Sequence, residues 1–342
     1  MFATTFCGIF VAEYWIRLRM EKRFIFCVAH PHGLSGDACL KLRDWLLFAL
    51  LAFFWGSNWS IMKMGLGFVP PLTFVLHRFI LSVAVLLPLF LVLRGKLPKD
   101  SQTLFRLVVL CLIFVSIIIL QALGLVNGNS GISAVLAYTQ PLFVFCLAVP
   151  VLLEQVTVAK LLGVAVGFIG VVVLSLGRTA SFTLDSVLIL LLSALAWAVA
   201  VLYYKKYLSH VDPFVTHFLQ LAVGTAPLII WSLATNSFAV PTDIGYLGIL
   251  SYSSVGALAF GNVIYLFLLK QEEATTLSGS TLIIPTVALL FGWLLLGEKP
   301  SPEALLGAVL TLTGVYLVNM KKRTRVKLAV SDRYRVFRNV FN

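Results

Sequence analysis

The sequence predicts an all-α polytopic membrane protein whose ten transmembrane helices form two inverted repeats of five. The first reason is composition: 60% of the 342 residues are apolar, 12% are charged, and the mean hydropathy is +0.99. Soluble domains carry about 25% charged residues, so this composition excludes a water-soluble protein of this length. The second reason is a series of long apolar runs. The third is that one half of the chain repeats in the other.

Residues 1–44 precede the apolar runs and are expected to lie outside the core fold. Their apolar stretch, residues 1–16, is followed by basic residues, whereas a signal peptide carries its charge before the apolar part. The stretch is also shorter than the about 20 residues that a membrane crossing needs. The segment is therefore either an interfacial helix or sequence upstream of a later start, for which Met20 is the candidate.

Ten apolar runs follow between residues 45 and 320. Each is long enough, at about 1.5 Å per residue, to cross a hydrocarbon core of about 30 Å. Inside a bilayer each run must satisfy its own backbone, and none alternates like a barrel strand, so each is predicted to be a helix. The runs are 45–66, 72–93, 104–125, 131–151, 158–177, 184–204, 213–235, 245–269, 274–296 and 303–320.

Basic residues between the runs predict the orientation in a cell membrane. Because positively charged connections stay in the cytoplasm, the richer set marks the cytoplasmic side, and both termini are expected there. The basic tail, residues 321–342, is typical of an anchor at lipid headgroups and has no folded module for nucleic acid. The richer set follows the even-numbered runs and the poorer set the odd-numbered ones: Arg94, Lys96, Lys99, Arg106, Lys160, Lys205, Lys206 and Lys270 against Lys63, Arg178 and Lys299.

Residues 45–177 and 178–320 form the two predicted repeats. SGISAVLAYTQPLFVFCLAVPVLLEQVTVAKLLGVAVGFIG from Ser130 aligns with ATTLSGSTLIIPTVALLFGWLLLGEKPSPEALLGAVLTLTG from Ala274. Five crossings per repeat is an odd number, so the second repeat enters the membrane the other way up. Inverted repeats place a substrate site near the midplane, between the halves. The paired residues are Pro141 with Pro285, Glu154 with Glu298, Gly163 with Gly307, Gly170 with Gly314, Trp55 with Trp197, Lys63 with Lys205, and Pro71 with Pro213.

This double pattern of proline, glutamate, LLG and a glycine-rich run resembles the EamA-type permeases of the drug/metabolite transporter superfamily. FWGSNW at 54–59 and TFVLHRF at 73–79 add to the resemblance, which covers about residues 45–320. The resemblance implies ten helices, inverted five-helix halves and transport of small metabolites, commonly amino acids or their relatives. It does not identify a substrate.

Polar residues within the runs are the candidate substrate ligands, because polar groups inside a bilayer are costly and often functional. Trp55 and Asn58 are three residues apart and share a helix face, where an amide beside an indole suits a polar organic molecule. For each residue alone, an interhelical hydrogen bond is the alternative. The predicted ligands are Trp55, Asn58, Arg78, Gln121, Tyr138, Gln140, Trp197, Asn262 and Ser280.

Arg78 has two interpretations. Its guanidinium fork fits a substrate carboxylate, but a structural role, in which it binds backbone carbonyls or reaches toward the interface, is preferred. The repeat places Gln220 at the corresponding position, so the charge is not duplicated.

Two prolines are expected to shape the site. Pro141 and Pro285 each remove a helical hydrogen bond and are predicted to kink their helices at corresponding places in the two halves.

No Asp or Glu lies in the middle of any run. A proton-driven antiporter usually needs such a carboxylate. Coupling would therefore use another group, such as His77 or, less readily, His217; otherwise the protein is a facilitator.

The motif formed by Gly163 and Gly167 is predicted to pack helices within one chain, with a homodimer as the alternative.

The preferred function is export of amino acids or similar metabolites by alternating access. Broad drug efflux and transport of nucleotide sugars or sugar phosphates are alternatives, and a non-transporting membrane protein is the least favoured.

Five cysteines without a repeated spacing predict no metal site, and no cofactor is expected. The usual hydrolase and nucleotide-binding motifs do not occur, so the sequence does not predict an enzyme.

Overall fold

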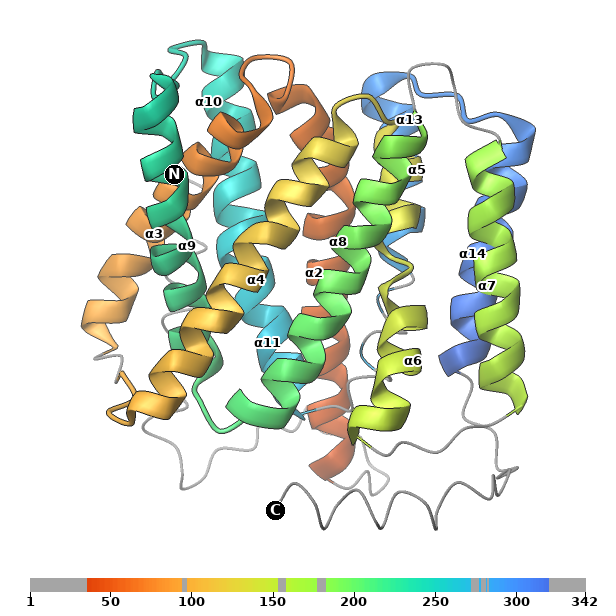
Figure 1. Ribbon diagram of the computed structural model, residues 1–342, viewed down its shortest axis with the longest axis horizontal. Coiled ribbons are helices and arrows are strands. Elements are labelled where there is room, and N and C mark those ends of the chain that lie inside the picture. Colours follow the sequence, from red (N-terminus) through yellow and green to blue (C-terminus); the bar gives the residue numbers. More distant parts are fainter. Residues whose placement is uncertain are drawn as a thin grey trace, which may run out of the picture.

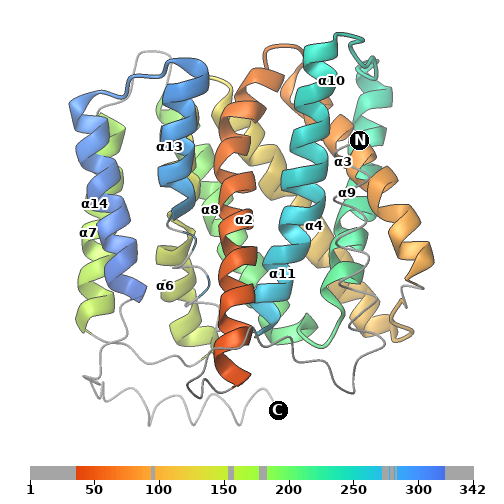
Figure 2. The same cartoon turned by 180° about the vertical axis from the view of Figure 1, so that it is seen from behind.

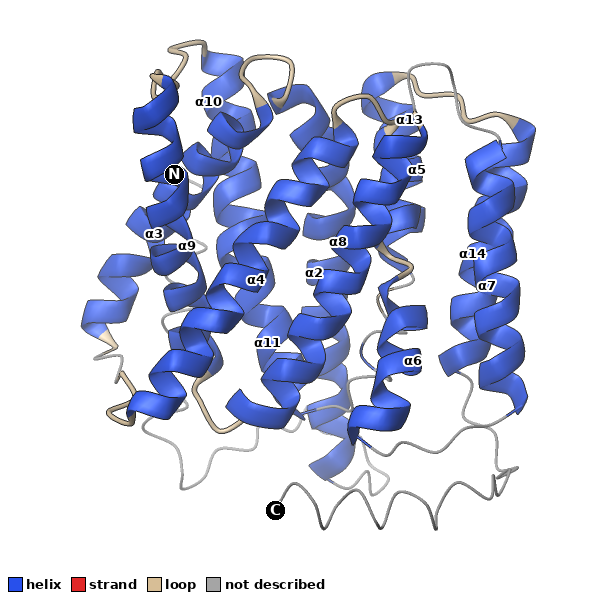
Figure 3. Cartoon of the chain, in the orientation of Figure 1, coloured by secondary structure: helices blue, strands red, loops and turns tan. Residues whose placement is uncertain are grey.

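A computed structural model describes residues 36–93, 97–152, 158–176, 183–271, 277, 281 and 283–319. Within these ranges the chain consists of helices and connecting loops, without strands (Figure 3). Their order is α2 (Gly36–Gly65), α3 (Pro71–Val92), α4 (Ser101–Leu125), α5 (Ser130–Ala137), α6 (Gln140–Leu152), α7 (Val158–Leu176), α8 (Leu184–Tyr203), η1 (Tyr204–Leu208), α9 (Pro213–Thr235), α10 (Ile244–Ser251), η2 (Tyr252–Gly261), α11 (Asn262–Gln271), α13 (Ile283–Leu296) and α14 (Pro302–Asn319).

Within the described residues, seven segments are long and apolar enough to cross a membrane, and three shorter apolar helices accompany them. The shorter helices are Lys160–Val173, Ile283–Leu296 and Pro302–Leu317. Of the ten predicted crossings, seven therefore have a described segment long enough to cross a membrane, and three correspond to the shorter helices. Helix α2 also differs from the prediction, because it begins at Gly36 rather than near residue 45. Most of segment 1–44, and the tail 321–342, lie outside the described residues.

Polar residues in the loops start several helices. Asp100 accepts a hydrogen bond from the backbone nitrogen of Thr103 at 2.7 Å, and Asp212 and Asp243 cap α9 and α10 in the same way. The Thr103 backbone bond also holds the pKa of Asp100 below its ordinary value, so this cap stays charged at neutral pH. Such caps satisfy amide groups that the first helical turn leaves free. These aspartates in the loops thus stabilise the first turns of α4, α9 and α10.

The helices run roughly side by side, and successive loops lie at opposite ends of the bundle (Figure 1). The α2–α3, α4–α5, α9–α10 and α13–α14 connections share one end, and the α3–α4 and α8–α9 connections lie at the other. Figure 2 shows α2 and the column of α10 and α11 in the middle of the opposite face. The centre of the bundle is therefore built from both halves of the chain.

Helices α7 and α14 pair along one edge of the bundle (Figures 1 and 2). They approach closely because glycines face each other: a Cβ on Gly314 would stand 2.3 Å from the backbone nitrogen of Gly167. A Cβ on Gly170 would meet the backbone of Thr311 at the same distance. The Gly163–Gly167 motif is thus used for packing within the chain, as the preferred interpretation held.

Among the described segments that are long and apolar enough to cross a membrane, two depart from regular α-helix. The segment from Ser130 to Leu147 is broken at Tyr138–Thr139, between α5 and α6. The segment from Ile244 to Lys270 passes through η2, a π-helix of ten residues. A π-helix frees backbone groups from the regular ladder and commonly marks a functional site. Both irregular stretches border the same central cavity.

Candidate substrate cavity

The central cavity lies where α2, α3, α4, the α5–α6 break, α8 and η2 converge. It encloses about 410 Å³ of empty space, part of it open at the mouth. Seven of the predicted substrate ligands line it together: Trp55, Asn58, Arg78, Gln121, Tyr138, Trp197 and Asn262.

Two predicted ligands are not in this group. Gln140 is buried at 3% exposure but does not line the cavity, because it lies past the α5–α6 break. Ser280 lies outside the described residues. Pro141 and Pro285 stand at the second position of α6 and the third of α13, where a missing N–H costs no helical hydrogen bond. The α5–α6 segment is thus interrupted just before Pro141 rather than bent within a continuous helix.

An aromatic cluster forms one wall. The ring centroids of Trp55 and Tyr265 are 5.1 Å apart, and those of Trp55 and Trp197 are 5.4 Å apart. The indole of Trp55 donates to the backbone oxygen of Ala257 at 3.0 Å, and that of Trp197 donates to the Tyr265 hydroxyl at 3.3 Å. Both indole N–H groups are therefore satisfied by protein, and the ring faces remain to pack against a ligand.

Some carbonyl groups of η2 accept hydrogen bonds from side chains outside it. His217 donates from its Nε2 to the Leu258 oxygen at 2.8 Å, when that ring nitrogen carries the proton. Ser82 donates to Ser254 at 2.9 Å, and Asn262 donates to Leu258 at 3.0 Å. Helices α3 and α9 are thereby attached to η2, the element that carries Ala257 and Leu258 into the cavity wall.

The amides of Asn58 and Gln121 supply neutral polar groups. Asn58 accepts a hydrogen bond from the Ser253 hydroxyl at 2.6 Å through its Oδ1. Its amide nitrogen makes no hydrogen bond to another described residue, and neither does the side chain of Gln121. Both amides can therefore donate to a polar molecule in the cavity.

Arg78 is the one cation among the described residues that line this cavity. It is 3% exposed, and its guanidinium makes two hydrogen bonds: Nη1 donates to the weak acceptor Met62 Sδ at 3.3 Å, and Nη2 donates to the Ser253 oxygen at 3.5 Å. Its central carbon also lies 5.8 Å from the centroid of the Phe74 ring. Its Nε has no hydrogen-bond partner within the described ranges. Burying a guanidinium whose N–H groups lack acceptors costs free energy, unless a bound molecule accepts those hydrogen bonds.

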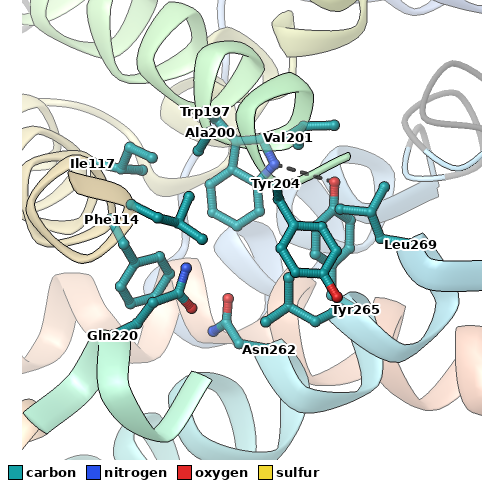
Figure 4. A pocket seen from close by; sticks show the side chains of 12 residues that line it. Phe114, Ile117, Trp197, Ala200, Val201, Tyr204, Gln220, Asn262, Tyr265 and Leu269 are labelled. Atoms are coloured by element: carbon teal, nitrogen blue, oxygen red, sulfur yellow. Dashed lines mark hydrogen bonds between the residues drawn. The ribbon is translucent and has the colours of Figure 1, made fainter. Parts of the chain in front are cut away.

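A second cavity lies beside the first, with about 350 Å³ of empty space. The two share Trp197 and Asn262 as lining residues. Figure 4 shows the amides of Gln220 and Asn262 on one side of this space, opposite the Trp197 indole. Sequence reasoning missed its other lining residues, such as Phe114 and Tyr204. Apolar and aromatic side chains at helical spacing look the same whether they fill a core or line a cavity.

A cluster at the end that carries the α4–α5 and α13–α14 connections ties the two halves together. We call Ser60, Lys63, Ser130, Gly131 and Glu298 the Glu298 cluster. Glu298 accepts from the backbone nitrogen of Ser130 at 2.7 Å and from its hydroxyl at 2.9 Å. Lys63 donates to the carbonyls at the end of α4, the shorter contact being 2.6 Å. A carboxylate at a helix N-terminus and an ammonium at a helix C-terminus both complement the helix dipoles.

Several of the proteins that match this chain are named as transporters. A family model described as the EamA-like transporter family matches residues 44–176 and 185–320. The chain is 30% identical over 292 residues to "Uncharacterized transporter YvbV" of Bacillus subtilis (strain 168), which covers 85% of this chain and 96% of that protein. It is 30% identical over 286 residues to "Uncharacterized inner membrane transporter YedA" of Escherichia coli (strain K12), covering 81% of this chain and 90% of that protein.

A solved crystal structure shares the fold. It superposes with a TM-score of 0.62 at 17% sequence identity, and the match covers 83% of this chain and 99% of that chain. At this identity the likeness concerns the arrangement of helices and not the chemistry of the cavity.

Proposed function

Because this chain belongs to the EamA-like transporter family, we propose that it carries amino acids or related small metabolites across the membrane through the central cavity. The chain is a multi-pass membrane transporter; its substrate, direction and mechanism are our proposal. The observation that carries the proposal is the convergence of polar and aromatic side chains from both halves of the chain on one cavity.

Alternating access between two inverted halves is the mechanism we propose. The helix contacts support it, because exchanging helices for their repeat counterparts reproduces several of the main helix–helix contacts. The contact of α4 with α8 corresponds to that of η2 with α2, and the contact of α4 with α9 corresponds to that of η2 with α3. The pairs α3–α9 and α7–α14 correspond to themselves. Such symmetry gives two equivalent packings, one open to each side.

The charge of the connections supports cytoplasmic termini, and export is the net direction that we propose. With that orientation the Glu298 cluster lies at the outer end of the bundle. It links α2, α4, α5 and Glu298, just after α13, and we propose that these bonds close the outer end. Opening to the outside would break these bonds.

Broad drug efflux is a second candidate, favoured by the aromatic lining of both cavities. Transport of nucleotide sugars fits less well, because bound phosphates call for several cations and the described lining holds Arg78 alone.

Efflux from proteoliposomes tests the proposal. Vesicles containing the purified protein are loaded with a pool of labelled amino acids, and release is compared with protein-free vesicles, with and without a pH gradient. Release without a gradient supports a facilitator, and release that needs the gradient supports proton coupling. Failure to release any amino acid, together with release of aromatic drugs, would overturn the proposal in favour of drug efflux.

A further inference from the structure

We propose that Arg78 binds the carboxylate of the transported compound, and that the cavity selects organic monoanions whether or not they carry an amine. This inference rests on the proposed function, since it concerns the same cavity. It narrows the substrate class to compounds with one carboxylate, and it does not require an amino group.

The contacts of Arg78 leave its donors largely unused. A guanidinium has five N–H groups, and good N–H···O hydrogen bonds measure about 2.9 Å. Arg78 reaches a thioether sulfur at 3.3 Å and a carbonyl at 3.5 Å, and its Nε has no partner among the described residues. Both acceptors are weak or distant. A carboxylate can accept two parallel hydrogen bonds from such a fork.

Lys63 shows what a structural cation looks like in this protein. Its ammonium donates to two backbone carbonyls at the end of α4, at 2.6 Å and 3.2 Å. Arg78 is more deeply buried, yet it has no comparable contact. A purely structural role would leave its donors unsatisfied at a cost that packing alone does not explain. The structure therefore favours the carboxylate interpretation of Arg78 over the structural one that the sequence preferred.

The charge of the cavity sets the class of ligand. No Asp or Glu is among the described residues that line it, so Arg78 gives the site a charge of +1. A buried charge is costly until an opposite charge joins it. A monoanion brings the site to neutrality, whereas an ammonium finds no acid there. The neutral amides of Asn58 and Gln121 and the surrounding rings suit the uncharged remainder of the compound.

The repeat limits the number of carboxylates to one. Gln220 stands at the position in the second half that corresponds to Arg78. It borders the second cavity and pairs with His217 at 3.0 Å. An amide in that place gives no second anion site, so dicarboxylates and diphosphates are disfavoured.

Matched compounds test the class of substrate. Proteoliposomes are loaded with leucine, 2-hydroxy-4-methylpentanoate, leucinamide and 3-methylbutylamine, and release above protein-free vesicles is measured by mass spectrometry. We expect the hydroxy acid to leave at least as fast as leucine, and the amide and amine to be retained. Release of leucine with retention of the hydroxy acid, or release of the amine as fast as the acids, would overturn the inference.

A second measurement does not depend on the choice of substrate. In a protein whose five native cysteines are replaced by alanine, Gln121→Cys is treated in detergent with an anionic sulfonatoethyl or a cationic trimethylammonioethyl methanethiosulfonate. We expect the anionic reagent to react faster, and the ratio of the two rates to fall about tenfold or more when Arg78→Gln is added. Thr73→Ala is the matched control, since Thr73 lies on the same helix, is buried outside the cavity lining, and its hydroxyl has no hydrogen-bond partner among the described residues.

The outcomes separate the two proposals. In the first outcome, the anionic reagent reacts faster, Arg78→Gln abolishes this preference, and none of the four compounds is released. That result would keep the anion site and overturn the proposed function for this class of compounds. Release of amino acids with equal rates for the two reagents, or no reaction with either, would keep the proposed function and overturn the anion site. Arg78→Lys provides a second variant that retains the charge if Arg78→Gln fails to fold.

Discussion

The indole rings of Trp55 and Trp197 meet edge to face, with centroids 5.4 Å apart and planes inclined at 87°. These residues occupy corresponding positions in the two halves of the sequence, 142 residues apart. Each ring also contacts Tyr265. The contact therefore joins the halves at the wall of the central cavity, which makes it a direct probe of how the halves depend on each other.

A double-mutant cycle should detect this dependence. We expect Trp55→Ala and Trp197→Ala to destabilise the protein non-additively, with a coupling free energy of about 0.5–1.5 kcal/mol from the ring contact. The measurement is thermal unfolding of the purified variants in detergent. Strict additivity of the two losses would mean that the rings do not interact in the membrane protein as they do here.

Asn58→Ala should lower transport about tenfold or more, because it removes an amide donor from the cavity, while membrane insertion stays unchanged. Ser116→Ala is the control, since Ser116 is exposed and bonds only its own helix. Gln140→Leu should cost less than Asn58→Ala, because Gln140 lies outside the cavity lining. Initial transport rates, corrected for the amount of inserted protein, decide between these expectations. Equal losses for the Asn58 and Gln140 variants would contradict the placement of the site.

Arg78→Lys should raise the KM for a carboxylate substrate about tenfold while the melting temperature changes little. Lysine keeps the charge but loses the two-pronged geometry that matches a carboxylate. Transport kinetics and thermal unfolding are measured on the same preparation. A lower melting temperature with an unchanged KM would return Arg78 to a structural role.

Glu298→Gln should lower the free energy of unfolding by about 1–3 kcal/mol, because the charged acceptor of the Ser130 backbone and hydroxyl bonds is lost. Gly292→Ala should act in the same direction, since its Cβ would stand 2.6 Å from Glu298 Oε2. The neighbouring Lys299→Gln is the control, because Lys299 is exposed. Thermal unfolding reports the loss. A drop for Lys299→Gln as large as that for Glu298→Gln would refute the cluster's role.

Gly314→Val should destabilise the protein by about 1–3 kcal/mol through overpacking between α7 and α14. Gly248→Ala is the matched control, since its Cβ would meet nothing within 4 Å. Thermal unfolding of both variants is compared with that of the parent protein. A tolerated valine at position 314 would show that the two helices lie farther apart than described.

Much of the architecture follows from local sequence properties. Helix and membrane character are decided by apolar composition over about 20 residues at a time. The family follows from residue patterns that repeat along the chain, and the match over residues 44–176 and 185–320 confirms it. Most of the cavity lining could also be named in advance, because polar groups are rare inside the membrane segments and therefore conspicuous.

The sequence did not predict the position of residues that share a type but are surrounded by different helices. Gln140 and Gln121 are both intramembrane glutamines, yet only Gln121 faces the central cavity. Phe114 and Tyr204 border the second cavity, although their sequence surroundings are those of core residues. The break at Tyr138–Thr139, ahead of Pro141, likewise did not follow from the sequence.

The sequence by itself thus determined that this chain is a helical membrane transporter of the EamA-like family, since these properties depend on composition and on spacing along the chain. Only the tertiary structure decided which polar side chains meet, that η2 presents its carbonyls to His217 and Asn262, and that Arg78 lacks a saturating partner. Hydrogen bonding and burial depend on groups that are distant in sequence, and periodicity along a helix does not specify which other helix will face it.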